Sequence, residues 1–109
     1  MAWVPSRGDV VWLHFDPQAG HEQAGHRLAL VLSPQKYNRL TNLMLCCPLT
    51  TVVKGYPFEV STNVGGKPGV VLADQVKSLD WCVRKAKKAG AVEQAVLDEV
   101  LAKIAALLM

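Results

Sequence analysis

The stretch Leu28-Ala29-Leu30-Val31-Leu32-Ser33 is a nearly unbroken apolar run. A short continuous run of this kind is typical of a strand that is buried on both faces. Pro34 follows at once and ends the strand, because proline cannot donate to a ladder of backbone hydrogen bonds. The sequence therefore predicts a strand over residues 28–33 that is enclosed on both sides.

The segments next to this strand also predict strands. Residues 10–15 follow the turn signal Arg7-Gly8-Asp9 and are rich in β-branched and aromatic residues. Residues 42–47 predict a third strand, closed by Pro48, and residues 49–53 predict a second half-strand after a kink. Between them, residues 35–39 predict one helical turn, with Ser33 as N-cap and Pro34 at the first helical position.

The second half of the chain changes from strands to a helix. Residues 58–61 alternate between apolar and polar side chains, residues 63–69 predict a hairpin connection, and residues 70–73 predict a buried strand. The remaining expectations are a short last strand at 81–83, a solvated basic face at 84–88, a break at Gly90 and a helix from about residue 92. In that helix apolar residues recur every three or four positions, which indicates one apolar face.

Five to seven short strands followed by one amphipathic helix indicate a mainly β fold. A small antiparallel barrel with a C-terminal helix satisfies this pattern. The 109 residues suit a single domain spanning 1–109.

The composition restricts the class of protein. Half of the residues are hydrophobic, 19% are charged and the formal charge is +3, which permits an anionic partner without requiring one. The three cysteines, Cys46, Cys47 and Cys82, form no pattern of paired disulfides or zinc ligands and predict small buried hydrophobes in a reducing compartment. No signal peptide or membrane-spanning run is found, so we expect a soluble cytoplasmic protein with no cofactor.

Residues 20–27 carry the densest group of chemically active side chains. Within Gly20-His21-Glu22-Gln23-Ala24-Gly25-His26-Arg27 lie a carboxylate, two imidazoles and a guanidinium. Loops often carry function because a rigid scaffold positions them. Two histidines and one acid on a loop are weak support for a metal site, so acid–base or anion-binding chemistry is the better interpretation.

Five motifs along the chain resemble one known family, and they occur in the order found there. The motifs are Gly8-Asp9-Val10-Val11-Trp12, Glu22-Gln23-Ala24-Gly25-His26-Arg27, Val31-Leu32-Ser33-Pro34, Lys54-Gly55-Tyr56-Pro57-Phe58-Glu59-Val60 and Leu72-Ala73-Asp74-Gln75-Val76-Lys77-Ser78. Together they resemble the MazF/PemK toxins of bacterial toxin–antitoxin modules. The resemblance implies an SH3-like barrel, a homodimer, and sequence-specific, metal-independent cleavage of single-stranded RNA. It also implies that a cognate antitoxin inhibits the protein and that cutting messages blocks translation.

The resemblance also assigns roles to particular residues. Metal-free cleavage begins with attack of the ribose 2′-OH on the adjacent phosphate and leaves a 2′,3′-cyclic phosphate and a 5′-OH. Arg27 and Thr50 match the positions at the scissile phosphate, where an arginine can bind two phosphate oxygens. Glu22 would accept the 2′-OH proton or orient Arg27. The expected RNA-binding residues are His26, Thr51, Lys54, Asp74, Gln75 and Lys77, whereas His21 receives less weight.

Two other classes of function compete with this interpretation. A barrel of the related CcdB type poisons DNA gyrase without catalysis, but it does so through a helix end that bears tryptophan. This chain ends with Ala105-Ala106-Leu107-Leu108-Met109 and lacks that tryptophan. The other is an SH3-like module that binds RNA or protein without chemistry, against which Glu22, Arg27 and Thr50 argue.

One position departs from the family pattern and generates a prediction. The family usually has proline after Gly-His-Arg, where this chain has Leu28. Proline would restrict Arg27 to extended conformations, so leucine is expected to weaken catalysis while the fold is kept. We therefore expect a Leu28→Pro variant to cut RNA faster than the unchanged chain in a single-turnover assay. An equal or lower rate from a folded variant would contradict this explanation.

Overall fold

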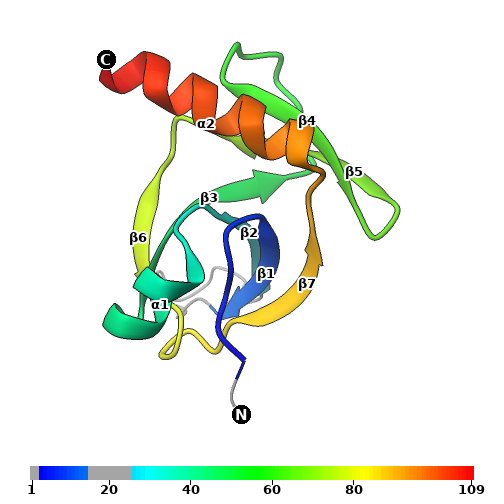
Figure 1. The fold of residues 1–109 in the computed structure, drawn as a ribbon. Helices are drawn as coiled ribbons and strands as arrows, with labels where there is room; N and C mark the ends of the chain where they lie inside the picture. The colour runs from blue at the N-terminus through cyan, green and yellow to red at the C-terminus, as the bar shows by residue number, and fades with distance from the viewer. Residues whose placement is uncertain (1–2, 15–25) are drawn as a thin grey trace, which may run out of the picture.

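In the computed structural model the central strand is β2 (His26–Val31), which begins two residues earlier than the sequence predicts. The structure describes residues 3–14 and 26–109. β2 pairs in antiparallel fashion with β1 (Asp9–His14) on one side and with β3 (Leu43–Thr50) on the other. Figure 1 shows these strands in the interior of a curved sheet.

The prediction that this strand is buried on both faces is confirmed. Leu30 belongs to one apolar cluster, which includes Leu97 and Val100 of the C-terminal helix α2 (Gln94–Leu108). Its neighbours Ala29 and Val31 belong to a second cluster on the other face. Because successive side chains of a strand point to opposite faces, one run of apolar residues contributes to both cores.

The second core is closed by strand β6 (Lys77–Asp80) and the segment that follows it. Leu79, Trp81 and Ala86 pack against it, and the Trp81 indole Nε1 donates a hydrogen bond of 2.9 Å to the carbonyl of Asn38. β6 pairs with β3, and β7 (Lys87–Ala91) pairs with β1 at the edge of the sheet. The sheet therefore curls around this core, as expected for a small barrel.

Strand β3 corrects the prediction that Pro48 ends a strand. β3 continues through Pro48 to Thr50 and pairs with three strands. On one edge, its pairing with β6 ends at Cys46 and its pairing with β5 (Lys67–Leu72) begins at Leu49. Pro48 thus lies where this edge changes partner, so its missing N–H costs little.

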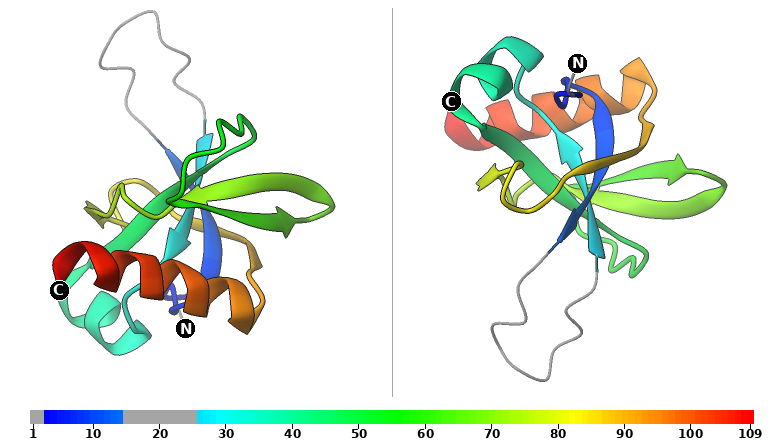
Figure 2. Two further views of the ribbon diagram at one scale, coloured as in Figure 1. Left: turned by 90° about the horizontal axis from the view of Figure 1, so that it is seen from above. Right: turned by 90° about the horizontal axis from the view of Figure 1, so that it is seen from below.

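The hairpin of β4 (Glu59–Val64) and β5 is tighter than predicted. The connection expected over residues 63–69 is reduced to Gly65 and Gly66, with φ of 59° and 84°. Two consecutive residues with positive φ are typical of the turns that join twisted antiparallel strands. The hairpin extends away from the rest of the barrel, as Figure 2 shows.

Two predictions near the C-terminus are wrong. Residues 81–85 form turns instead of a strand, and Gly90 lies inside β7 instead of breaking the chain. β7 contains lysines, alanines and a glycine, so the pairing with β1 stabilises it more than its side chains do. The helix prediction is confirmed, with α2 beginning two residues later than expected.

The short helix α1 (Gln35–Thr41) is longer than the single turn predicted, and its N-cap is Pro34, not Ser33. The Ser33 hydroxyl instead donates to Asn38 Oδ1 at 2.6 Å and accepts from the Leu45 N–H at 2.9 Å. Asn38 is fully buried, and its amide nitrogen donates to the carbonyls of Pro5 and Ser33. These hydrogen bonds satisfy the buried amide, which would lower the stability of the fold if it had no partners.

The cysteine prediction is confirmed for two of three residues. Cys46 and Cys47 are buried, whereas Cys82 is exposed in the turns after β6. Burial raises the pKa of Cys46 to about 11 and that of Cys47 to about 12, so both are protonated thiols at neutral pH. Within residues 3–14 and 26–109, neither helix is long and apolar enough to cross a membrane.

Candidate active site

The strand register brings Arg27 and Thr50 to the same end of the sheet. Ala29 lies opposite Pro48, and Leu30 opposite Cys47, so each step back along β2 is a step forward along β3. Continued for two residues, this register places Arg27 level with Thr50 and on the same face. Arg27 is exposed and Thr50 is half-buried, which leaves this pair accessible at the rim of the barrel.

Thr50 is held in place by a contact with the segment after β3 and by pairing with β5. Its Oγ1 accepts a hydrogen bond of 3.1 Å from the Val52 N–H, and its backbone lies opposite Val70. A hydroxyl that accepts this bond still has its own proton to donate. Thr50 can therefore donate to a phosphate oxygen while its side chain stays fixed.

Gly69 allows β5 to approach Thr50 closely. A Cβ atom at position 69 would lie 2.8 Å from the Thr50 carbonyl oxygen, which is backbone and cannot rotate away. Glycine in a strand often marks such a close approach. The sequence pattern predicts a hairpin connection at Gly69 and gives no sign of this close approach.

Thr51 and Lys54 follow Thr50 on the exposed segment between β3 and β4, so the structure keeps both near this end of the barrel. Glu59, which the sequence analysis treated as the polar position of an alternating strand, fixes this segment. Its carboxylate accepts hydrogen bonds from the N–H groups of Lys54 and Gly55, at 3.1 and 2.9 Å. The only signal in the sequence was an acid four residues after the glycine of a turn.

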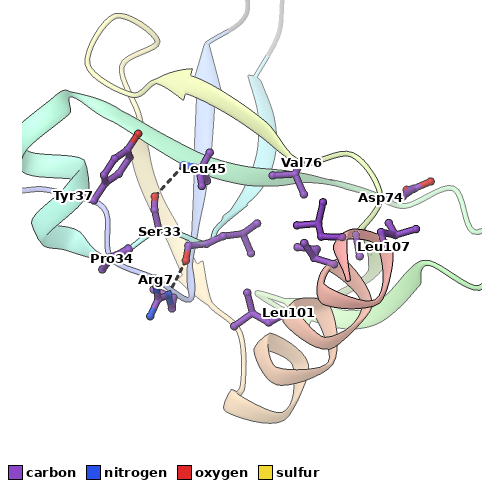
Figure 3. A pocket seen from close by; sticks show the side chains of 13 residues that line it. Arg7, Ser33, Pro34, Tyr37, Leu45, Asp74, Val76, Leu101 and Leu107 are labelled. Atoms are coloured by element: carbon purple, nitrogen blue, oxygen red, sulfur yellow. Dashed lines mark hydrogen bonds between the residues drawn. The ribbon is translucent and has the colours of Figure 1, made fainter.

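Asp74 and Gln75 lie between β5 and β6, and Lys77 begins β6, farther from Thr50. Lys77 pairs with Cys46, four residues from Thr50, which is about 13 Å along an extended strand. Asp74 lines an apolar cavity with the end of α2, beside Leu107 in Figure 3. The structure thus groups Arg27, Thr50, Thr51 and Lys54 at one end of β3, whereas Lys77 lies beside the middle of that strand.

Glu22 and His21 lie outside the described residues. His26 begins β2 with its backbone opposite His14, and its side chain also lies outside the described part. Among residues 3–14 and 26–109, no group of three His, Cys, Asp or Glu side chains is placed to hold a metal ion. The described part of the site consists of one guanidinium, two hydroxyls and one ammonium, a set suited to an anion.

Comparison with known proteins places the chain in a family. The family described as PemK-like, MazF-like toxin of type II toxin–antitoxin system matches residues 6–108. The chain is 53% identical over 102 residues to the endoribonuclease toxin MazF of Escherichia coli K12, covering 94% of this chain and 92% of the relative. It is 39% identical to the endoribonuclease toxin ChpB of the same organism, over 92% of this chain and 90% of ChpB.

Solved structures agree with the sequence matches. The MazE–MazF complex of Deinococcus radiodurans (Form-II) contains a chain that superposes with a TM-score of 0.92 at 53% identity, covering 98% of this chain and 97% of that one. The MazF structure of the same organism (Form-I) gives a TM-score of 0.86 at the same identity, with 98% of each chain covered.

The close approach at Gly69 generates a prediction about the position of Thr50. A Gly69→Ala variant should be destabilised by about 1–3 kcal/mol, because the added methyl forces β5 and β3 apart. Denaturant unfolding measures the loss, and the amide resonance of Thr50 should shift. Gly90→Ala is the matched control, since its Cβ would meet the side chain of Val64 at 3.4 Å. Equal stabilities and an unmoved Thr50 resonance would contradict the constraint.

Proposed function

Because the chain belongs to the PemK-like, MazF-like toxins of type II toxin–antitoxin systems, we propose that Arg27 and Thr50 form the phosphate-binding centre of a metal-independent ribonuclease. The protein is an endoribonuclease toxin that an antitoxin neutralises. The observation that supports the proposal is the register of β2 and β3, which, continued for two residues, would bring an exposed arginine level with a threonine hydroxyl. The substrate is single-stranded RNA in the cytoplasm, cut at a specific sequence, so that translation stops.

The proposed chemistry needs a proton acceptor, a proton donor and positive charge over the phosphorane. The ribose 2′-OH attacks the adjacent phosphorus, and its proton passes to a base, for which Glu22 is the candidate. Arg27 binds two phosphate oxygens and Thr50 donates to one of them, which stabilises the added negative charge. The bond from phosphorus to the 5′ oxygen breaks and the leaving oxygen takes up a proton from the donor, which gives a 2′,3′-cyclic phosphate and a 5′-OH.

The RNA would extend from this centre in two directions. His26, Thr51 and Lys54 would contact nucleotides next to the scissile phosphate. Asp74, Gln75 and Lys77 would contact nucleotides about two positions away, in keeping with their distance along β3. Single-stranded RNA suits such a site because its unpaired bases can be read on their edges. The cognate antitoxin, through an acidic segment, would cover the same surface.

Arg27 provides the first test of this proposal. We expect Arg27→Lys to lower the cleavage rate of a long RNA in EDTA about 10–100-fold, because lysine keeps the charge but loses bidentate binding. Thr50→Val should lower it similarly. Arg39→Lys is the control, because the Arg39 guanidinium on α1 is exposed and donates a hydrogen bond to the Gln35 side chain.

End mapping distinguishes the functions in the same assay. Discrete cuts with 5′-OH ends support the proposal, whereas unchanged cleavage by Arg27→Lys contradicts the role of Arg27. Intact RNA together with inhibition of gyrase would favour the CcdB type of toxin. Intact RNA that is nevertheless bound would favour a module without catalysis.

We also propose that the toxin is a homodimer. A cavity of about 700 Å³ lies between α1, β3 and the end of α2, and its lining is mainly apolar (Figure 3). Leu45, Val76, Leu107 and Leu108 all line it and are exposed in the single chain. A contiguous exposed apolar surface usually marks a protein–protein interface, and a self-complementary surface is the usual basis of a two-fold dimer.

The dimer proposal is tested at the end of α2. Leu107→Asp should convert a dimer to a monomer in sedimentation equilibrium, since an unpaired carboxylate would be buried in the interface. Leu40→Asp is the control, because Leu40 is 77% exposed and does not line the cavity. A wild-type chain that sediments as a monomer at all concentrations would contradict the proposal.

A further inference from the structure

The segment between β3 and β4 exposes an unusual group of side chains. All of residues 51–57 are exposed, and they include Val52, Val53 and Tyr56, each at least 60% accessible. Single exposed apolar residues are common, but a cluster on one short segment usually marks a binding surface. Lys54, between them, adds a positive charge.

The backbone of this segment is nevertheless fixed. The two carboxylate oxygens of Glu59 accept hydrogen bonds from the N–H groups of Lys54 and Gly55, and the Glu59 N–H donates to the Tyr56 carbonyl at 3.1 Å. Gly55 has a φ of 83°, a conformation that other residues rarely adopt. The hydrogen bonds of Glu59 thus hold the backbone of the segment in one conformation.

The C-terminal helix supplies a second anchor. Lys103 Nζ donates a hydrogen bond of 2.6 Å to the Pro57 carbonyl and lies 3.9 Å from the Glu99 carboxylate. At its other end the segment joins Thr50, whose hydroxyl accepts the Val52 N–H. The exposed side chains are therefore held at a fixed position relative to the candidate catalytic threonine.

We propose that residues 52–56 form a preorganised base-binding arm, on which Tyr56 stacks against a nucleobase near the scissile phosphate, and that Glu59 is its positioning residue. The inference rests on the proposed ribonuclease function. Stacking on an aromatic ring is the usual way to bind an unpaired base, and Lys54 can approach the adjoining phosphate. A fixed arm loses less conformational entropy on binding than a mobile one.

Glu59 does not touch the RNA in this arrangement. A carboxylate facing RNA would repel the phosphates, but both oxygens of Glu59 are engaged by backbone N–H groups. Such charge-assisted bonds are stronger than neutral ones. Losing one of them should therefore weaken substrate binding and leave the chemistry at Arg27 and Thr50 intact.

Glu59→Gln tests the positioning role. Glutamine keeps one acceptor oxygen but places an NH₂ group against a backbone donor. We expect KM for an RNA oligonucleotide to rise about 10-fold, in line with the loss of a bond to a charged group, with kcat within a factor of two. The amides of residues 54 and 55 should also exchange faster with solvent. Glu93→Gln is the control, since Glu93 precedes α2 and its side chain makes no cap hydrogen bond.

Tyr56 tests the stacking itself and does not depend on folding, because its side chain is exposed. Affinity is measured with a 2′-O-methyl RNA oligonucleotide, which binds but cannot be cleaved. Tyr56→Ala should weaken binding about 10-fold, as expected for one lost base stack, whereas Tyr56→Phe should bind as the wild type does. Leu40→Ala on α1 is the control for removal of an exposed apolar side chain.

The outcomes separate the arm from the function. In one outcome the wild type cleaves RNA while Glu59→Gln has an unchanged KM or Tyr56→Ala an unchanged affinity. That result would contradict the base-binding arm and leave the proposed ribonuclease function intact. If the wild type neither cleaves nor binds RNA, both proposals fall. If Tyr56→Ala weakens binding of an acidic antitoxin peptide but not of RNA, the arm belongs to the antitoxin interface instead.

Discussion

Burial of β2 on both faces is the constraint on which the rest of the structure depends. When every side chain of a strand is apolar, both faces of the strand must be covered, since successive side chains point to opposite faces. Helix α2 covers one face with Leu97 and Val100, and β6 with the segment after it covers the other with Leu79 and Trp81. The sheet must curl so that β6 and the segment after it can pack on the second face of β2, and this curling gives the barrel its shape.

The candidate site lies where this buried arrangement ends. Toward its N-terminus β2 changes from buried residues to the exposed Arg27, and β3 changes in the opposite chain direction from the buried Cys47 to Thr50. Antiparallel pairing brings these two ends together. The candidate catalytic side chains thus lie on paired strands while they still face solvent, a combination that preorganised electrostatic catalysis requires.

Strand β3 links the parts of the molecule that the proposals use. One of its edges passes from β6 to β5 at Pro48, so residues on both sides of that point share one backbone. Gly69 lets β5 approach Thr50, and Glu59 at the start of β4 fixes the exposed segment that follows. The proposed phosphate-binding, base-binding and dimer surfaces therefore all adjoin a single strand.

The sequence by itself determined the fold class, the doubly buried strand and the amphipathic helix, because apolar periodicity is a local property of the chain. Family motifs also identified Arg27 and Thr50 as candidates. The tertiary structure decided the path of β3 through Pro48, strand β7 with its Gly90, and the two-residue turn at Gly65 and Gly66. It alone showed that β2 and β3 pair in the register that points Arg27 and Thr50 to the same end of the sheet, and that Glu59 binds the Lys54 and Gly55 amides. These features depend on backbone pairing between distant segments, which side-chain patterns do not encode.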